Sequence, residues 1–597
     1  MKPYKEADPK VTINRIRNIL NELDIFTIDS FFNNSNSNFL SCRLTIGNAD
    51  CEGLGIGTNG KGINYEFALA SAYGELMERM QNSRLFRNMK FATKKFITNT
   101  ENNQFKQKLI DNEIVLDYLF AQDEKYIDTD EFPSNILKSL TETESREEAI
   151  TFIKKKLLMD KMLSIPFINI TDRKKEYLPI NLIDLKLRSN GMSAGNTPEE
   201  SMLQAICEIL ERYALKKIFY EGIVPPDIPN EYFKEEKIYE NLNGIEERYG
   251  LKAIVKDCSL GIGIPVIGLL LIDTSTSSYT FKLGCDTSPV IALERCFTEI
   301  YQGSPKGKFK TIELFENSKP DARNFARILI SGTGKWPQHI FNEKPTYEFS
   351  GHNYVSKSYK EDLKYVINRI ESLGHKIYIR DSSFLNFPSY FVYIPGMSEM
   401  ETNETVQIWN FLQNNLSFLF DLKNASHSMI KEGANSIANI DADVRDLFLY
   451  NLSEDILVDN DLFLTMLYLI IEDYSKALIH IDKFIDKLDS NDEDYNYFFI
   501  VKTFISLRNT GKSDKEIKKH LERYYSTTLA ETVLNDCQDT NSILKNYKFP
   551  TCFNCEICPN EIECRYFKIV RIMKNIQTLA MKNPIDQNNI IALLNLN

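Results

Sequence analysis

The periodicity of the apolar residues changes once along this chain, and the change constrains the fold more than any other feature. Up to about residue 408, apolar β-rich runs such as Ile264–Ile272 and Tyr390–Ile394 alternate with segments of helical pattern. After Gly396 the strand-like runs disappear, and Asp461–Leu488 carries apolar residues at helical spacing. We therefore predict an α+β domain over residues 1–408 and an all-α domain over residues 409–597.

One stretch of the second region has the pattern of a helical repeat. Leu464–Ile485 reads as a pair of helices in which Tyr474 and Ala477 fall where the second helix packs closely on the first. This spacing is typical of a tetratricopeptide-type unit. A single such pair fits a tetratricopeptide-like domain and also a helical bundle of another kind, so both alternatives stay open.

Composition excludes several classes of protein. Hydrophobic residues make up 43% of the 597 residues, which is enough to build real cores and argues against a disordered chain. The net charge of -12 disfavours a broad surface for nucleic acid, because it repels a phosphate backbone. No apolar run approaches the roughly 20 residues that span a membrane, and the N-terminus lacks the apolar stretch of a secretory signal. We expect a cytoplasmic protein without nucleic acid or membrane partners.

A recurring acidic motif is the clearest functional signal. The pattern Glu-x-x-Glu-Arg occurs twice, and spacings of three and four residues place its charged groups on one helical face. A variant follows near residue 295, again with its polar side chains on one face. The three copies comprise Ser71, Glu75, Glu78 and Arg79, then Glu208, Glu211 and Arg212, and finally Arg295, Glu299 and Gln302.

Such helices have two interpretations. Glutamate and arginine at this spacing usually form a solvated, salt-bridged surface. Here, however, apolar residues such as Leu76 and Met77 lie between the acids, and crowded carboxylates in apolar surroundings repel one another and resist ionisation. Bound divalent cations remove that conflict, and Mg²⁺ commonly bridges carboxylates and phosphates. We favour a nucleotide site with Mg²⁺.

The segment before the second acidic helix has a strong helix-start signal. Thr197 is a good N-cap, Pro198 suits the first helical position and Glu200 completes a capping box. The small residues 191–195 before the cap leave backbone N–H groups free, which suits a phosphate. Glu200 can therefore be a structural cap or a ligand contact.

A P-loop is a second way to bind a nucleotide and must be weighed. Gly55–Gly62 meets the Gly-x4-Gly-Lys pattern through Lys61, but Gly62 replaces the hydroxyl residue that holds Mg²⁺. A P-loop kinase is therefore disfavoured, and it predicts that nucleotide binding depends entirely on Lys61.

Three long blocks in this order resemble the YcaO family of ATP-dependent enzymes that activate backbone amides. They read GTNGKGINYEFALASAYGELMERM, SNGMSAGNTPEESMLQAICEILERY and GCDTSPVIALERCFTEIYQG, and the later FVYIPGMSEM resembles the end of the family's domain. The resemblance covers about the first 400 residues. The helical tail is similar to that of the enterobacterial subgroup, which carries a tetratricopeptide-like C-terminal domain.

The resemblance implies repeated α/β pieces around an ATP site without a P-loop. It implies carboxylate ligands of Mg²⁺ at Glu75, Glu78, Glu208, Glu211 and Glu299, and phosphate contacts at Arg79, Arg212 and Arg295. It further implies a nucleotide lining of Ser71, Ser193, Asn196, Glu200 and Gln302, with Lys5 and Thr12 as the N-terminal pair seven residues apart. Thr12 stands where Ser is more usual.

The family chemistry is O-phosphorylation of a backbone amide, which turns a poor leaving group into a good one and gives azolines, thioamides or amidines. Phosphoryl transfer needs positioning and charge neutralisation rather than an enzyme nucleophile. The resemblance implies a peptide or protein substrate, with a sulfur donor or an E1-like or TfuA-like protein as candidate partner and a homodimer as candidate assembly. The alternative is an accessory or adaptor protein for ribosomal protein methylthiolation that binds ATP without independent catalysis.

Two departures from the family pattern disfavour a stand-alone azoline cyclodehydratase. The chain ends in Leu594–Asn597 rather than in a Pro-x-Pro-x-Pro tail, and we find no leader-binding domain before the first block.

Four cysteines cluster near the end of the chain. A packed core rarely explains four thiols within thirteen residues, whereas a Cys₄ zinc site or an iron–sulfur cluster does. We slightly favour Zn²⁺ over an iron–sulfur cluster at Cys552, Cys555, Cys558 and Cys564.

Overall fold

The computed structural model divides into two compact units. It describes residues 4–32, 39–48, 56–85, 124–301, 309–312, 321–330, 332–342, 344–415, 422, 425–440, 459–488, 495–537, 542–543 and 565–594. The first unit comprises Met1–Arg87, Tyr118–Val406 and Lys568–Asn597, and the second comprises Asn88–Asp117 and Gln407–Phe567. Our division into residues 1–408 and 409–597 stays a prediction. The two compact units differ from it in two respects, because residues 88–117 belong to the second unit and residues 568–597 belong to the first.

The return of the C-terminal segment has a clear packing reason. Ile590 is buried in the core of the first unit, and Gln587 bonds both the backbone N–H and the carbonyl of Asp381. These contacts link segments about two hundred residues apart, so local sequence pattern carries no sign of them.

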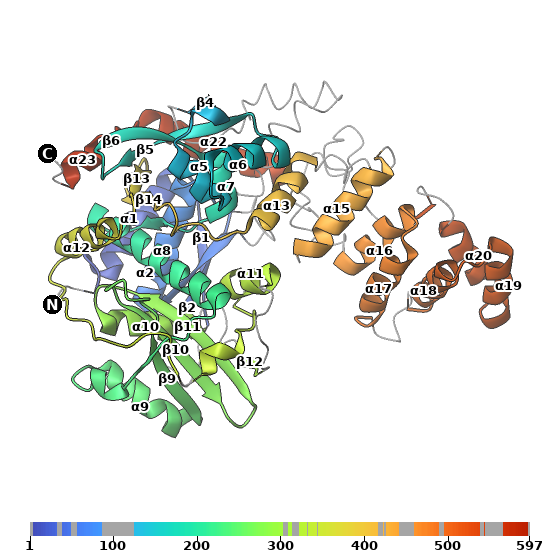
Figure 1. Cartoon of the computed structure of the whole chain (residues 1–597), viewed down its shortest axis with the longest axis horizontal. Helices are drawn as coiled ribbons and strands as arrows, with labels where there is room; N and C mark the ends of the chain where they lie inside the picture. Colours follow the sequence, from blue (N-terminus) through green and yellow to red (C-terminus); the bar gives the residue numbers. More distant parts are fainter. Residues whose placement is uncertain are drawn as a thin grey trace. The chain divides into compact units, whose positions relative to one another are not determined.

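A three-stranded antiparallel sheet opens the first unit (Figure 1). Its order is β1 (Thr27–Phe32), β2 (Leu40–Ile46) and β3 (Gly57–Gly62), and α1 (Pro9–Glu22) and α2 (Tyr65–Gln81) belong with it. Gly60 and Gly62 let β3 lie against α2, since a Cβ at either position would overlap the helix backbone. This close approach fixes α2 over one face of the sheet.

A second sheet is covered on both faces. Its order is β12 (Lys310–Thr311), β11 (Ser278–Cys285), β10 (Val266–Asp273), β9 (Leu251–Asp257) and β8 (Asp227–Ile228). Ile267 and Leu269 of β10 pack with α9 (Ile238–Tyr249) and α10 (Pro289–Tyr301), whereas Val266 and Leu270 join the core of α8 (Pro198–Glu221). Burial on both faces explains why β10 is apolar at nearly every position.

The third sheet lies on the other side of α8. Its strands are β4 (Lys125–Asp128), β5 (Lys161–Asn169), β13 (Tyr378–Asp381), β14 (Ser389–Tyr393) and β7 (Met192–Ala194), and β6 (Lys174–Pro179) pairs with β5. Helix α8 packs against β7, β11 and β14, and it begins at the predicted N-cap Thr197. The other helices are α5 (Ser134–Thr141), α6 (Arg146–Thr151), α7 (Ile180–Leu187), α11 (Ala322–Ile330), α12 (Tyr359–Ser372), α22 (Arg565–Lys582) and α23 (Asn589–Leu593).

The described part of the second unit is helical. The helices are α13 (Asn403–Asn415), which crosses the division between the units, then α15 (His427–Ile440), α16 (Asn460–Ile470), α17 (Tyr474–Ile485), α18 (Tyr495–Asn509), α19 (Asp514–Tyr524) and α20 (Thr527–Asp536). The predicted helix pair appears as α16 and α17, with Ala477 fully buried between them. The predicted fold class, α+β followed by a mostly helical region, is confirmed. The tetratricopeptide-like assignment stays a prediction.

Within the described ranges, no helix combines the length and the apolar character needed to cross a bilayer.

Candidate functional site

A polar cavity of about 700 Å³ lies in the first unit, within the size range of small-molecule sites. Each predicted nucleotide or Mg²⁺ residue that the structure describes lines it, although these residues come from the N-terminal segment, α2, β7, α8 and α10. The set is Lys5, Thr12, Ser71, Glu75, Glu78, Arg79, Ser193, Asn196, Glu200, Glu208, Glu211, Arg212, Arg295 and Glu299. Gln302 lies outside the described residues.

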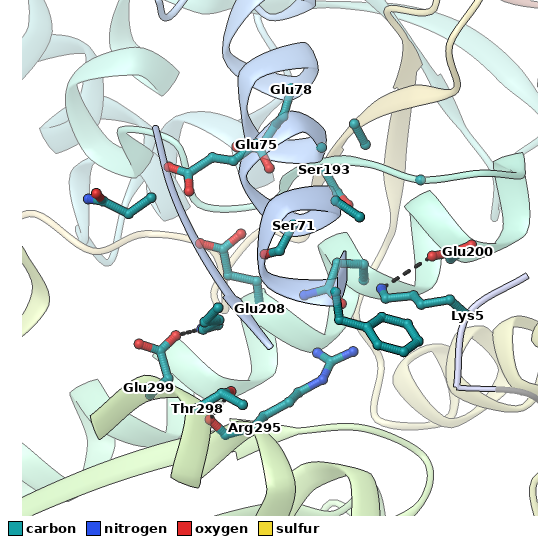
Figure 2. A pocket seen from close by; sticks show the side chains of 18 of the residues that line it. Lys5, Ser71, Glu75, Glu78, Ser193, Glu200, Glu208, Arg295, Thr298 and Glu299 are labelled. Carbon is teal, nitrogen blue, oxygen red and sulfur yellow. Dashed lines mark hydrogen bonds and ion pairs between the residues drawn. The ribbon is translucent and has the colours of Figure 1, made fainter. Parts of the chain in front are cut away.

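Helix α2 supplies the first acidic group. Its apolar residues, including Ala72 and Leu76, are buried, and this orientation leaves Glu75 and Glu78 along the cavity. Arg79 lies 3.3 Å from the Glu75 carboxylate and 3.4 Å from that of Glu78. Figure 2 shows both glutamates on the same stretch of helix, with Ser71 one turn before them.

Helix α8 supplies the second group. Arg212 Nε lies 3.0 Å from Glu208 Oε1, and Glu211 lines the same cavity. Because α8 is buried between two sheets, its charged residues occupy one of the few places where the helix meets open space.

The carboxylates of the two helices crowd one another. Burial raises the pKa of Glu78 well above its ordinary value, and the charges of Glu208 and Glu75 raise it further against the opposing effect of Arg79. Burial also raises the pKa of Glu211, although Lys61 opposes the shift. The predicted conflict between neighbouring acids is therefore present in the structure.

Helix α10 supplies the third group. Arg295 lies 3.3 Å from Asp286, and although burial disfavours the charged guanidinium, Asp286 holds the pKa of Arg295 above its ordinary value. Glu299 forms an ion pair with Lys61 of β3. Burial lowers the pKa of Lys61 to about 8, even though the nearby Glu211 favours the charged form.

The N-terminal segment and the start of α8 close the other end of the cavity. Lys5 forms an ion pair with Glu200 at 3.2 Å, drawn as a dashed line in Figure 2. The Thr12 hydroxyl donates to Asn196 Oδ1 at 2.6 Å. Asn196 in turn donates to Glu200 Oε2 at 3.1 Å. Burial alone would raise the pKa of Glu200, but Lys5 and these hydrogen bonds lower it. The backbone N–H of Glu200 donates to the side chain of the cap Thr197. The Glu200 carboxylate bonds Lys5 and Asn196 rather than the Thr197 backbone, so the predicted capping box does not form.

One face of the first sheet contributes residues that we did not predict. Arg43 pairs with Asn59 across β2 and β3, Ser41 pairs with Lys61, and Arg43, Asn59 and Lys61 line the cavity. The alternation of β3 held the signal, since Thr58 and Gly60 are buried whereas Asn59 and Lys61 are not. Gln204, Lys282 and Thr298 were also missed.

The P-loop alternative does not match this geometry. Gly57–Gly62 is a strand paired with β2, whereas a P-loop wraps a phosphate with a loop that leads into a helix. Lys61 therefore belongs to the cavity through its place on a sheet.

The metal assignments remain predictions. Across the residues that the structure describes, no three His, Cys, Asp or Glu side chains already form a metal-binding group. The glutamates line the cavity as an all-oxygen donor set that suits Mg²⁺, but several are held by Arg79, Arg212 and Lys61. Cys552, Cys555, Cys558 and Cys564 lie outside the described residues, so Zn²⁺ and an iron–sulfur cluster are also untested.

The solved structures that are similar to this chain include a heterocyclase and a YcaO protein. One is a heterocyclase in complex with substrate and cofactor, with a TM-score of 0.46 and 16% identity over 67% of this chain and 55% of that one. The other is YcaO from Methanopyrus kandleri bound with AMPPCP and Mg²⁺, with a TM-score of 0.40 and 17% identity over 66% and 92% of the two chains.

Two proteins are more similar to this chain in sequence. The ribosomal protein S12 methylthiotransferase accessory factor YcaO of Escherichia coli is 26% identical over 430 residues, which cover 68% of each chain. An uncharacterized protein of Haemophilus influenzae is 26% identical over 389 residues, and the match spans 62% of each chain, less than two thirds of that relative's length.

The match to a family model shows which family this chain belongs to. The model for YcaO cyclodehydratases, described as ATP- and Mg²⁺-binding, matches residues 59–398, which is more than half of the chain. This range runs from the cavity strand β3 to the segment after β14 and includes the three acidic helices. The resemblance read from the motifs is confirmed, and the chain belongs to the YcaO family.

Proposed function

We propose that this protein uses ATP and Mg²⁺ to activate a backbone amide of a peptide or protein by O-phosphorylation. The observation that carries the proposal is the meeting of three acidic helices, far apart in sequence, at one cavity. Family membership supports the same conclusion, because the family model describes ATP- and Mg²⁺-binding cyclodehydratases.

The two ends of the cavity suit different parts of a nucleotide. Lys5, Thr12, Asn196 and Glu200 form a hydrogen-bonded end with neutral and charged donors, which suits the base and sugar. The glutamates of α2, α8 and α10 lie toward the other end beside Arg79, Arg212 and Arg295, where arginine can pair with phosphate oxygens. Lys61 adds a further positive group on that side.

Mg²⁺ would be held by glutamates among Glu75, Glu78, Glu208, Glu211 and Glu299. When bound, it neutralises the charge of the phosphates and of the carboxylates together. Burial raises the pKa of Glu78 and of Glu211, and the neighbouring Glu208 raises both further, so a bound cation would relieve an unfavourable charge at these carboxylates, which supports this assignment.

The chemistry follows from the weakness of an amide oxygen as a leaving group. Transfer of the γ-phosphoryl group to that oxygen forms a P–O bond and breaks the bond to ADP, and the oxygen later departs as phosphate. The incoming thiol, sulfide or amine then determines whether the product is an azoline, a thioamide or an amidine. Within this reaction the chain's own residues bind, orient and neutralise charge, and a sulfur donor or an E1-like or TfuA-like partner would bring the other reactant.

Calorimetric titration with MgATP tests the proposal. We expect binding to the full chain that requires Mg²⁺, and a loss of at least tenfold in affinity for Glu75→Ala and for Glu211→Ala. Glu66→Gln on the exposed side of α2 is the matched control and should bind as the wild type does. Equal affinity in all four proteins would contradict the site assignment.

An accessory role is the second candidate, and the name of the Escherichia coli relative favours it. In that role the protein binds ATP and supports ribosomal protein methylthiolation without catalysing a reaction itself. The mass of the ribosomal protein in a deletion strain tests whether this role needs the nucleotide site. Full restoration of the modification by Glu75→Ala would support an accessory role without ATP chemistry, whereas failure of this variant beside a successful wild type would support use of the nucleotide site.

A further inference from the structure

Gly74 lies at a position of α2 where glycine is unfavourable for helix stability. It lies in the middle of this helix and lines the cavity, between Tyr73 and Glu75. Glycine in a helix interior lowers helix stability relative to alanine, because it loses more backbone freedom on folding. A glycine at such a position calls for a physical reason.

Packing within the protein does not supply that reason. A Cβ at Gly60 or Gly62 of β3 would overlap the backbone of α2, so those two glycines are required by the approach of strand and helix. A Cβ at Gly74 would meet no heavy atom within 4 Å outside its own stretch of helix. Gly74 also lacks the positive φ that favours glycine elsewhere in the first unit, as at Gly191.

A polar group without a partner faces the same cavity. Ser193 of β7 is 1% exposed and lines the cavity, and its hydroxyl bonds no described residue. Figure 2 shows Ser193 and Ser71 near each other, with Glu75 and Glu78 further along α2. A buried hydroxyl without a partner is unfavourable unless a ligand supplies the missing bond.

The neighbours of Gly74 indicate the kind of ligand. Ala70 and Ser71 precede it by about one turn and are also small, so this stretch of α2 presents little bulk to the cavity. The stretch lies between the hydrogen-bonded end at Glu200 and the glutamates that follow on α2. A ligand that spans the two ends must pass Gly74.

We propose that Gly74 is a specificity-determining residue whose missing side chain leaves room for the ribose–phosphate part of a bound nucleotide. This inference rests on the proposed function and extends it, because it assigns the stretch at Ala70, Ser71 and Gly74, with the Ser193 hydroxyl, to the middle of the nucleotide. The helix has glycine rather than the more stabilising alanine at this position because the methyl group of alanine would occupy the space of the ligand.

The substitution Gly74→Ala separates this inference from a purely structural role. In the free protein we expect the melting temperature to rise by about 1–2 °C, since alanine stabilises a helix where it has room. In titrations with Mg²⁺ and AMPPCP, a non-hydrolysable ATP analogue, we expect the affinity of the same variant to fall at least tenfold. A more stable protein that binds less nucleotide is the signature of a glycine kept for its ligand.

Asn18→Ala is the matched control. Asn18 is exposed on α1 and is not among the cavity residues, so this change also raises helix propensity. It should raise the melting temperature and leave AMPPCP affinity unchanged.

Three outcomes would overturn the inference. Unchanged AMPPCP affinity in Gly74→Ala, beside a clear loss in Glu75→Ala, would overturn it and leave the proposed function intact. A lower melting temperature in Gly74→Ala would show that packing does require glycine. Absence of AMPPCP binding by the wild type would remove the inference and the proposed function together.

Discussion

The two ends of the cavity shift the pKa values of their carboxylates in opposite directions. At the N-terminal end, Lys5 and Asn196 hold Glu200, and its pKa lies below the ordinary value of a glutamate. At the other end, burial and the neighbouring acids raise the pKa of Glu78. The carboxylate at the first end is stabilised in its charged form by an ion pair and hydrogen bonds, whereas burial at the second end disfavours the charged form of Glu78. Under the proposed function, the second end is therefore where we expect a bound cation, and the first end is where we expect a structural role.

The largest effect should come from Glu78→Gln, which removes a carboxylate whose charged form burial disfavours. We expect MgATP affinity to fall at least a hundredfold, which corresponds to about 3 kcal/mol. We expect the metal-free protein to be at least as stable as the wild type, because a crowded, buried charge is gone. Titration with MgATP and urea unfolding in EDTA measure the two quantities. A variant that binds normally, or that unfolds far more easily, would contradict the comparison.

Glu200→Gln, unlike Glu78→Gln, should destabilise the protein. Its carboxylate accepts charge-assisted hydrogen bonds, so we expect the free energy of unfolding to fall by about 1–3 kcal/mol. Urea unfolding checks this, and a double-mutant cycle with Lys5→Met should give a coupling energy of about 0.5–3 kcal/mol. Strictly additive losses would show that Lys5 and Glu200 do not act as a pair.

The two ends should also respond oppositely to pH in metal-free buffer. Glu78 has a higher pKa in the folded protein than in the unfolded chain. Its contribution to the free energy of unfolding is therefore fully present below its pKa in the unfolded chain, and it is lost as pH rises through its pKa in the folded protein. Glu200 has a lower pKa in the folded protein than in the unfolded chain. Its contribution to the free energy of unfolding is therefore present above its pKa in the unfolded chain, and it is lost as pH falls through its pKa in the folded protein. Acidification therefore strengthens the contribution of Glu78 and weakens that of Glu200.

Urea unfolding of the wild type and both glutamine variants from about pH 2 to about pH 8 measures this contrast, because the range must extend below the lowered pKa of Glu200. Acidification should favour the wild type over Glu78→Gln, and it should remove the advantage of the wild type over Glu200→Gln. Parallel pH profiles for the three proteins would mean that the two glutamates have equivalent surroundings.

The smallest effect should come from Lys61→Met. Its ammonium pairs with Glu299 beside a cavity that is also lined by four arginines, so other positive groups remain after its loss. We expect MgATP affinity to fall about tenfold, or about 1.4 kcal/mol, rather than to vanish as a P-loop requires. Lys154→Met is the control, since Lys154 pairs with an exposed aspartate and surface pairs contribute little. Complete loss of binding in Lys61→Met would restore the P-loop interpretation.

Sequence reasoning succeeded where spacing along one helix determines which side chains lie together. The intervals between Glu75, Glu78 and Arg79 place them on one face whatever the rest of the fold does, and the N-cap at Thr197 is equally local. The similarity of whole blocks to a known family supplied the rest, because it linked the three helices to one site.

Sequence reasoning failed where position depends on pairing between distant segments. The alternation of β3 places Asn59 and Lys61 on one face, but the position of Arg43 beside Asn59 depends on the register of β2 and β3, which neither strand reveals by itself. Ile590 and Gln587 join the first unit through contacts with segments far away in sequence. The open space beside Gly74 is likewise visible only once the opposite wall of the cavity is in place.

A crystal structure of the full chain with AMPPCP and Mn²⁺ would test the central claim most directly, because anomalous scattering locates Mn²⁺ without ambiguity. The account predicts metal bound by glutamates from both α2 and α8, with the phosphates between them and Arg295. Metal and nucleotide bound elsewhere, with no ligand at the cavity lined by Glu78 and Glu211, would contradict it.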